Sequence, residues 1–247
     1  MKKVKSNLEQ EVIMQPIPLE RTQTQIRINE FIRSVYNWMA IGLSLTGFVA
    51  YYVSNNEFLS KFIFGNQLVF FGLIISELVL VFYLAARIGK IRPATATSMF
   101  ILYAALNGAT LAAIFLIYTR SSITSTFFIC AATFVVCSIY GMTTKRDLTS
   151  IGGFMIMGLI GIIIASVVNL FIRSAGMSLI ISYIGVVVFV GLTAYDTQKL
   201  KSMALSQPAD LDVGVFRKGA VMGALTLYLD FVNLFLMLLR ILGSNRN

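Results

Sequence analysis

The chain has 247 residues, of which 57% are hydrophobic and 13% are charged, and its net charge is +9. Soluble domains carry roughly 25% charged residues, so this composition predicts an integral membrane protein. The basic residues lie in short segments between apolar runs and form no patch with interleaved aromatics, so we expect no nucleic-acid binding.

The first segment, residues 1–28, is polar, mixes both charges and contains no apolar core. It lacks the apolar stretch of a secretory signal. We therefore expect a flexible cytosolic tail over residues 1–28, followed by a single membrane domain over residues 29–247.

Seven apolar runs follow, each near the roughly 20 residues that span a bilayer as a helix. They cover residues 33–53, 67–86, 96–118, 122–142, 151–172, 177–198 and 216–243. Lipid offers no partner to a free backbone group, and the alternation of a membrane β-barrel is absent from these runs. The sequence therefore predicts an all-α protein with seven transmembrane helices.

The lysines and arginines predict the orientation. Fifteen lie in the tail and after the second, fourth and sixth runs, and five lie on the opposite side. Positive segments usually stay in the cytosol, so we expect the N-terminus inside and the C-terminus outside. The last run has a polar centre, which also allows a re-entrant segment.

Few ionisable residues lie inside the apolar runs: Glu77 in the second, Asp196 near the end of the sixth, and Asp230 in the seventh. Arg87 lies at the inner end of the second run. A carboxylate at the middle of a membrane helix costs about 2.5–3.5 kcal/mol on insertion scales, so it usually faces protein or a water-filled cavity. These acids are therefore candidate functional residues.

Asp230 belongs to a stripe on one helix face, formed with Thr226, Asn233 and Met237 at spacings of three and four. Such a stripe is expected to face protein or water. Two interpretations stay open. Asp230 is either a neutral buried acid that fixes packing, or one of two carboxyls that share a proton and line an ion path.

The other charged residues have simpler alternatives. Asp196 precedes Lys199 by three residues near the cytosolic boundary, so it could be solvated or paired with a lysine. Arg87 fits a snorkelling, positive-inside residue. Glu77 is ten residues from Arg87 on the same helix, so it needs another partner or stays protonated. The depths of Asp196 and Asp230 match only if the seventh run is shifted towards the cytosol or both helices project beyond the lipid.

Four segments in order resemble the Bax inhibitor-1 family of membrane proteins, in its bacterial branch. They are PATATSMFILYAALNG (93–108), KRDLTSIGGFMIMGLIGIIIASVVNLF (145–171), GLTAYDTQKLK (191–201) and ALTLYLDFVNLFLMLLRILG (224–243). The resemblance covers roughly residues 25–245. It implies seven helices with the last one central and surrounded by the other six.

The resemblance also implies a function, a pH-sensitive Ca²⁺ leak in which two aspartates of the last two helices sense protons. The matching residues are Asp196 and Asp230, and Arg87 is the nearest match to a basic latch on the second helix. Two aspartates fall short of the about six to eight oxygens that Ca²⁺ prefers, so Thr226, Asn233, carbonyls and water would complete weak, transient binding. Glu77 is a further candidate for the ion path. We expect no cofactor, with Ca²⁺ as the transported ion, and a bacterial cytoplasmic membrane as the location.

Two other classes of function are alternatives to a leak. The chain could be a membrane-embedded regulator that binds a partner, such as a membrane-anchored quality-control protease, through its tail. An enzyme is disfavoured, because the chain has no histidine, phosphate loop or H-E-x-x-H motif. Proton–cation exchange stays open as an alternative to a passive leak.

Overall fold

The structure is a computed structural model that describes residues 19–208 and 211–246. The described chain is almost entirely helical, with one isolated bridge between Tyr118 and Asn245. The helices are α2 (Leu19–Asn55), α3 (Glu57–Phe64), α4 (Gln67–Arg87), α5 (Pro93–Leu111), α6 (Ala113–Ile117), α7 (Arg120–Thr143), α8 (Thr149–Ile172), α9 (Ala175–Leu205) and α10 (Val213–Leu242).

Within the described residues, six helical segments are long and apolar enough to cross a membrane: α4, α5 with α6, α7, α8, α9 and α10. They coincide with the last six apolar runs, which confirms that prediction. The first run lies within α2, which is not among the six. Its apolar part is interrupted by Asn37, Trp38, Ser44 and Thr46, which lower its mean hydropathy.

Three features differ from the predicted boundaries. Helix α2 begins at Leu19, so it extends into the expected tail, whose residues 1–18 lie outside the described residues. Ile28, Phe31 and Val35 are buried at helical spacing, which explains why the helix starts before the continuous apolar run. The third run breaks at Ala112 between α5 and α6, and the short helix α3 was not predicted.

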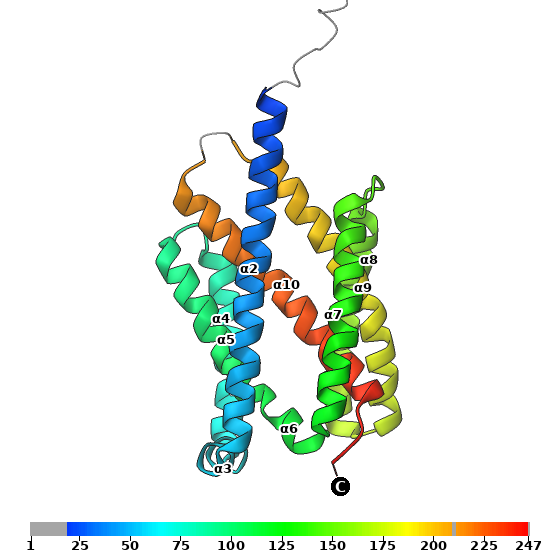
Figure 1. Ribbon diagram of the computed structural model, residues 1–247. Coiled ribbons are helices and arrows are strands. Elements are labelled where there is room, and N and C mark those ends of the chain that lie inside the picture. Colours follow the sequence, from blue (N-terminus) through cyan, green and yellow to red (C-terminus); the bar gives the residue numbers. More distant parts are fainter. Residues whose placement is uncertain (1–18, 209–210, 247) are drawn as a thin grey trace, which may run out of the picture.

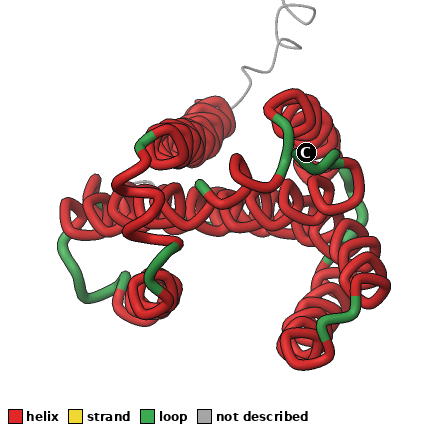
Figure 2. Tube along the Cα trace, turned by 90° about the horizontal axis from the view of Figure 1, so that it is seen from below, coloured by secondary structure: helices red, strands yellow, loops and turns green. Residues whose placement is uncertain are grey.

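Helix α10 crosses the molecule diagonally, with α2, α4 and α5 on one side and α7, α8 and α9 on the other (Figure 1). The view along the bundle also shows one long helix running between the two groups (Figure 2). It packs against α2, α5, α7 and α9, whereas α4 packs mainly on α5 and α8 mainly on α9. Half of its most apolar window is buried (50%), against at most 33% in the other five segments.

Glycines set the closest approaches of the helices around α9. A Cβ at Gly141 of α7 would collide with the carbonyl oxygen of Ala194, and one at Gly152 of α8 would collide with the ring of Tyr195. Gly223 of α10 would meet Leu200 at 2.6 Å. Small residues at these positions let α7, α8 and α10 approach α9 closely, as is usual between membrane helices.

Candidate functional site around Asp196 and Asp230

The structure brings Asp196 of α9 and Asp230 of α10 close enough for their carboxyl groups to interact. An ionised carboxylate can only accept hydrogen bonds, so a hydrogen bond between the two requires that one of them carries a proton. Asp230 is only 5% exposed, and within the described residues its Oδ2 has no hydrogen-bond partner. The pair therefore joins a buried carboxyl, Asp230, to a half-buried one, Asp196, and leaves one oxygen of Asp230 without a partner. We call the two residues the dyad.

The two acids reach the same depth because of the lengths and tilt of their helices. Helix α9 continues to Leu205, so more than two turns follow Asp196 and this residue lies deeper than its sequence context suggested. Helix α10 is strongly tilted, so the distance from Val213 to Asp230 covers less depth than in an upright helix (Figure 1). These two features resolve the mismatch noted for the sequence.

The predicted stripe of α10 faces a single cavity. Thr226, Asp230, Asn233 and Met237 all line a space of about 630 Å³ between α8, α9 and α10, together with Asp196. Its other walls are mainly apolar. The Asn233 amide donates to the carbonyl of Leu229 at 2.8 Å, which leaves its side-chain oxygen as an acceptor.

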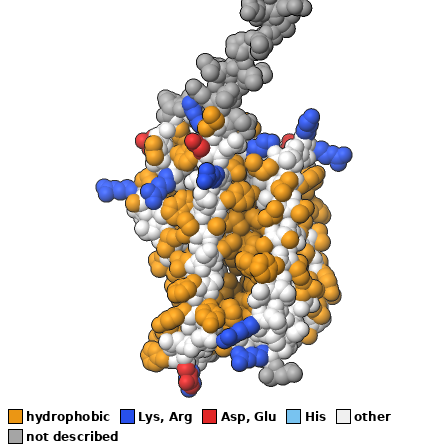
Figure 3. Space-filling view, in the orientation of Figure 1, with side chains coloured by type: hydrophobic (Ala, Val, Ile, Leu, Met, Phe, Trp, Pro, Cys, Tyr) orange, Lys and Arg blue, Asp and Glu red, His pale blue; other side chains and the backbone are white. Residues whose placement is uncertain are grey.

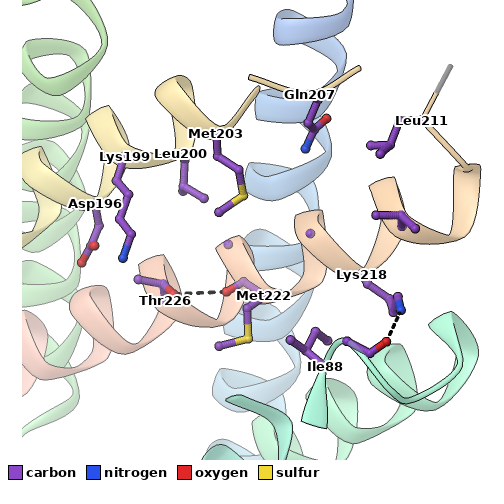
Figure 4. A pocket seen from close by; sticks show the side chains of 14 residues that line it. Ile88, Asp196, Lys199, Leu200, Met203, Gln207, Leu211, Lys218, Met222 and Thr226 are labelled. Carbon is purple, nitrogen blue, oxygen red and sulfur yellow. Dashed lines mark hydrogen bonds between the residues drawn. The ribbon is translucent and has the colours of Figure 1, made fainter. Parts of the chain in front are cut away.

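A second cavity of about 580 Å³ lies between the C-terminal part of α9 and the N-terminal part of α10, beside the connection from α4 to α5 (Figure 4). Lys218 closes one side by donating to the carbonyl of Gly89 at 3.1 Å. Asp196, Lys199 and Thr226 line both cavities. The two spaces therefore adjoin at Asp196, whereas Asp230 lines only the first.

The cation beside Asp196 is Lys199. Both side chains extend from α9 towards α10 in Figure 4, and the ammonium acts electrostatically on the Asp196 carboxyl. Arg87 is exposed at the end of α4 and lines neither cavity. Within the described residues, the one ion pair closer than 4.0 Å joins Glu57 and Lys61, so the structure does not bring Arg87 to Asp196 as the latch prediction requires.

Glu77 does not join the dyad and lines neither of its cavities. It is 9% exposed, and its carboxyl accepts hydrogen bonds from the Asn107 amide at 3.0 Å and from the Thr110 hydroxyl. Glu77 thus finds its partners on α5, as its isolation from Arg87 required.

The bonds between Glu77 and α5 continue into a network that reaches two further helices, α10 and α2. The Tyr228 hydroxyl of α10 donates to the Asn107 carbonyl oxygen at 3.0 Å and lies 2.6 Å from the Thr46 hydroxyl of α2. Thr46 also donates to the carbonyl of Ala104 at 2.8 Å. This network ties α2, α4, α5 and α10 together by buried polar contacts.

Sequence reasoning missed four residues of this network: Thr46, Asn107, Thr110 and Tyr228. Asn107 was the available signal, because an amide inside an apolar run needs a partner. Its partner could not be deduced, since spacing along one helix does not show which face of another helix it meets. Lys199 was considered beside Asp196, but only as a boundary charge.

Among the described residues, no three acids or cysteines come together as a set of metal ligands. The dyad therefore offers two carboxyls and neutral oxygens. Such a set can hold a proton, or can bind a hard cation briefly while the cation keeps most of its water.

Comparisons with known proteins give one consistent result. A family model described as "Inhibitor of apoptosis-promoting Bax1" matches residues 28–247. The inner membrane protein YbhL of Escherichia coli K12 is 49% identical over 224 residues, which is 91% of this chain and 95% of YbhL. An uncharacterized protein of Borreliella burgdorferi is 46% identical over 94% of this chain and 99% of its own length. Uncharacterized protein RP147 of Rickettsia prowazekii is also 46% identical, over 89% of this chain and 92% of its own length.

Proposed function

Because the chain belongs to the Bax inhibitor-1 family and is a multi-pass membrane protein related to bacterial inner membrane proteins, we propose that it is a pH-sensitive Ca²⁺ leak channel. In this proposal it acts as a channel and not as an enzyme. The gate is the dyad of Asp196 and Asp230.

One observation supports the proposal above the others. Two interacting carboxyls, one of them on the most buried of the six candidate membrane helices, line one cavity, and Asp196 also lines the second. Two carboxyls this close do not both ionise cheaply, so the pair titrates in separated steps. The net charge at the junction then depends on pH.

The gating step follows from that charge. With one proton shared, the hydrogen bond holds α9 and α10 together at the junction. Loss of the proton leaves two adjacent anions that repel each other and attract a divalent cation. The same event therefore loosens the contact between the last two helices and creates a cation site.

The cation would pass the dyad without being held tightly. Asp196 and Asp230 supply charge, and the side-chain oxygens of Thr226 and Asn233, which can still accept, line the same cavity. These groups fall short of the about six to eight oxygens of a storage site, so water must supply the rest. Weak, transient occupancy suits conduction, which requires an ion to leave as easily as it enters.

We further propose seven crossings, with α2 as the additional one and α10 as the central helix. Polar residues are tolerated in a crossing where they face protein, and Thr46 of α2 is buried against α10 through its contact with Tyr228. The excess of lysine and arginine on one side then places the N-terminus in the cytosol and the C-terminus outside.

The test is Ca²⁺ and proton flux in liposomes that contain the full chain, from pH 5 to 8. A site that titrates one proton changes its occupancy by up to about tenfold per pH unit. We expect Asp196→Asn and Asp230→Asn each to flatten the pH dependence. Asp147→Asn is the matched control, because Asp147 lies in the exposed connection before α8.

The outcomes separate the candidate functions. Unchanged flux and pH dependence in both dyad variants would overturn the gating role. Obligatory opposite proton movement would identify proton–cation exchange in place of a leak. If the wild-type chain carries no flux at all, the regulator that binds a membrane protease becomes the better hypothesis, and deletion of residues 1–18 in cells tests it.

A further inference from the structure

A groove separate from the dyad opens on the membrane-facing side of the bundle, between α2 and α7. Both helices pack on α10, which forms the floor. The groove has a volume of about 310 Å³, and its walls and floor include Leu43, Gly47, Phe115, Phe127, Phe231 and Phe235. Figure 3 shows this face hollowed between the two helices, with hydrophobic side chains around the hollow.

The few polar groups that line the groove are already satisfied. The Thr46 hydroxyl donates to the carbonyl of Ala104, and the Thr124 hydroxyl donates to the carbonyl of Arg120 at 2.9 Å. A space lined in this way offers little to water, which needs about two to four polar partners. The part of a ligand that enters it must therefore be apolar.

A basic residue stands at one end of the groove. Arg120 begins α7, one turn before the lining residue Ile123. Its guanidinium lies 5.7 Å from the centre of the Tyr51 ring, which itself packs edge-on against Phe115 of the groove wall. Arg120 is thus fixed beside the apolar space by its neighbours, and Figure 3 shows basic side chains beneath the hollow on the same face.

Arg120 also has donors to spare. It donates one hydrogen bond to Asn55 Oδ1 at 2.9 Å, and no carboxylate of the described residues lies within 4.0 Å of it. A guanidinium carries five N–H donors and binds phosphate oxygens in forked pairs. An exposed arginine at the end of membrane helices lies at the level where lipid phosphates are found.

From this combination we infer that the groove between α2 and α7 is a binding site for an anionic phospholipid. One acyl chain lies in the groove on α10, and the phosphate binds Arg120. The apolar lining selects a hydrocarbon chain, and the positive charge at its end selects an anionic head group over a neutral one. The site is independent of the dyad and of the proposed channel function.

The chain offers a direct test by fluorescence, because Trp38 is its only tryptophan. A Trp38→Phe background with Phe128→Trp puts a reporter on the groove wall, and Phe154→Trp puts a matched reporter on the exposed face of α8. Each full-length protein is placed in nanodiscs of phosphatidylcholine with increasing phosphatidylglycerol that carries brominated acyl chains. Bromine quenches a tryptophan that it touches.

We expect the groove reporter to reach half-maximal quenching at a mole fraction about fivefold lower than the α8 reporter, as one basic contact to an anionic lipid provides. Gly47→Phe should remove this preference by filling the groove, since a Cβ there meets no atom within 4 Å. Gly161→Phe, at another open glycine, should not. Arg120→Gln should remove the preference for the anionic lipid. In a parallel series in which the phosphatidylcholine is brominated instead, the groove reporter of this variant should still be quenched, because the apolar groove is unchanged.

Equal quenching curves for the Phe128→Trp and Phe154→Trp reporters, each without a further substitution, would overturn the proposal. Weaker quenching at the groove than on α8 would also overturn it, since it would mean that protein, such as a second copy of the chain, covers the groove. Gly47→Leu repeats the filling test if Gly47→Phe does not fold, and Arg120→Gln tests the head-group contact without changing the groove.

Discussion

Lys199, and not the predicted Arg87, is the basic residue that the structure places near Asp196 in the proposed gate. Its ammonium acts on the Asp196 carboxyl, and it lines both cavities of the dyad. A fixed positive charge in the path of a cation raises the barrier to entry. Of these two basic residues Lys199 is thus the one near Asp196, although its ammonium is not within 4.0 Å of that carboxyl.

Replacement of Lys199 by methionine should therefore increase Ca²⁺ flux at neutral pH. Partly exposed charge pairs are worth about 0.5–1 kcal/mol, which corresponds to roughly two- to fivefold in flux. Liposome flux of Lys199→Met measures this, with Lys145→Met as the control because Lys145 is exposed and lines neither cavity. A flux that falls, or that rises equally in the control, would contradict the role of Lys199.

Tyr228 holds the second polar centre together. Its hydroxyl donates to Asn107 and lies beside the hydroxyl of Thr46, in the buried interior of the bundle. Tyr228→Phe leaves the Asn107 oxygen without that donor. Hydrogen bonds between membrane helices contribute about 0.6–1.7 kcal/mol, so we expect the free energy of unfolding to fall by that amount.

Thermal unfolding in detergent measures the effect of Tyr228→Phe, and Tyr183→Phe provides the control because Tyr183 is exposed on α9. Dyad-dependent flux should keep its pH dependence in Tyr228→Phe, since the network and the dyad share no residue. Equal stability of the variant and the wild type would show that the network contributes nothing to the fold.

Sequence reasoning reached some of these residues and not others, for a physical reason. Asp230 was found because a charge inside an apolar run is costly wherever the helix packs. Its pairing with Asp196 came from family resemblance, since the sequence alone left their depths unmatched. Asn107 and Tyr228 acquire their roles only through contacts across helices, which periodicity along one helix does not reveal. Lys199 lies three residues after Asp196 on the same helix, but only the structure shows that both side chains extend towards α10.

At the scale of elements, the glycine contacts decide how closely α7, α8 and α10 approach α9. Helix α9 carries Asp196, so its position relative to α10 determines whether the two carboxyls meet. The contact at Gly141 tolerates a side chain least, because the neighbouring atom is the backbone carbonyl oxygen of Ala194, which cannot rotate away.

Gly141→Ala should therefore destabilise the protein despite the higher helix propensity of alanine. Overpacking of a tight contact costs about 1–3 kcal/mol, and we expect a corresponding loss in the free energy of unfolding. Gly161→Ala is the control, because a Cβ at Gly161 meets no atom within 4 Å and alanine should stabilise the helix by up to about 1 kcal/mol. The opposite ranking would show that α7 and α9 are not held in this register.

The element boundaries also show which helices a hydropathy pattern predicts well. The last six apolar runs match helical segments to within a few residues, because each remains apolar on nearly all sides whether it faces lipid or other helices. The predicted start of helix α2 was too late. Ile28 and Phe31 form a buried stripe on one face, but the polar side chains between them lower the mean hydropathy of the segment. Helix α3 escaped prediction because eight residues are too few for a spanning pattern.

At the scale of the whole molecule, the number of crossings and the orientation are linked. With a cytosolic N-terminus, seven crossings place the C-terminus outside, whereas the six confirmed by length and composition alone would place it inside. Helix α2 decides between them.

A reporter that is active only outside the cytosol, such as alkaline phosphatase, tests this arrangement. We expect activity from fusions after Asn56 and after Asn247, and none from a fusion after Lys90. A fluorescent protein fused at the same three sites should give the reverse pattern. A silent phosphatase after Asn56 would remove the crossing by α2.

The position of α10 has a consequence for biosynthesis. It is the last helix in the chain, yet it contacts α2 and α5 on one side and α7 and α9 on the other. A ribosome releases the N-terminal parts first, so the earlier helices must wait in the bilayer with their inward faces uncovered until the final segment is translated. Insertases or chaperones that shield unassembled helices should therefore matter most for this protein before α10 is synthesised, and a frameshift ahead of α10 would remove the helix that contacts both groups.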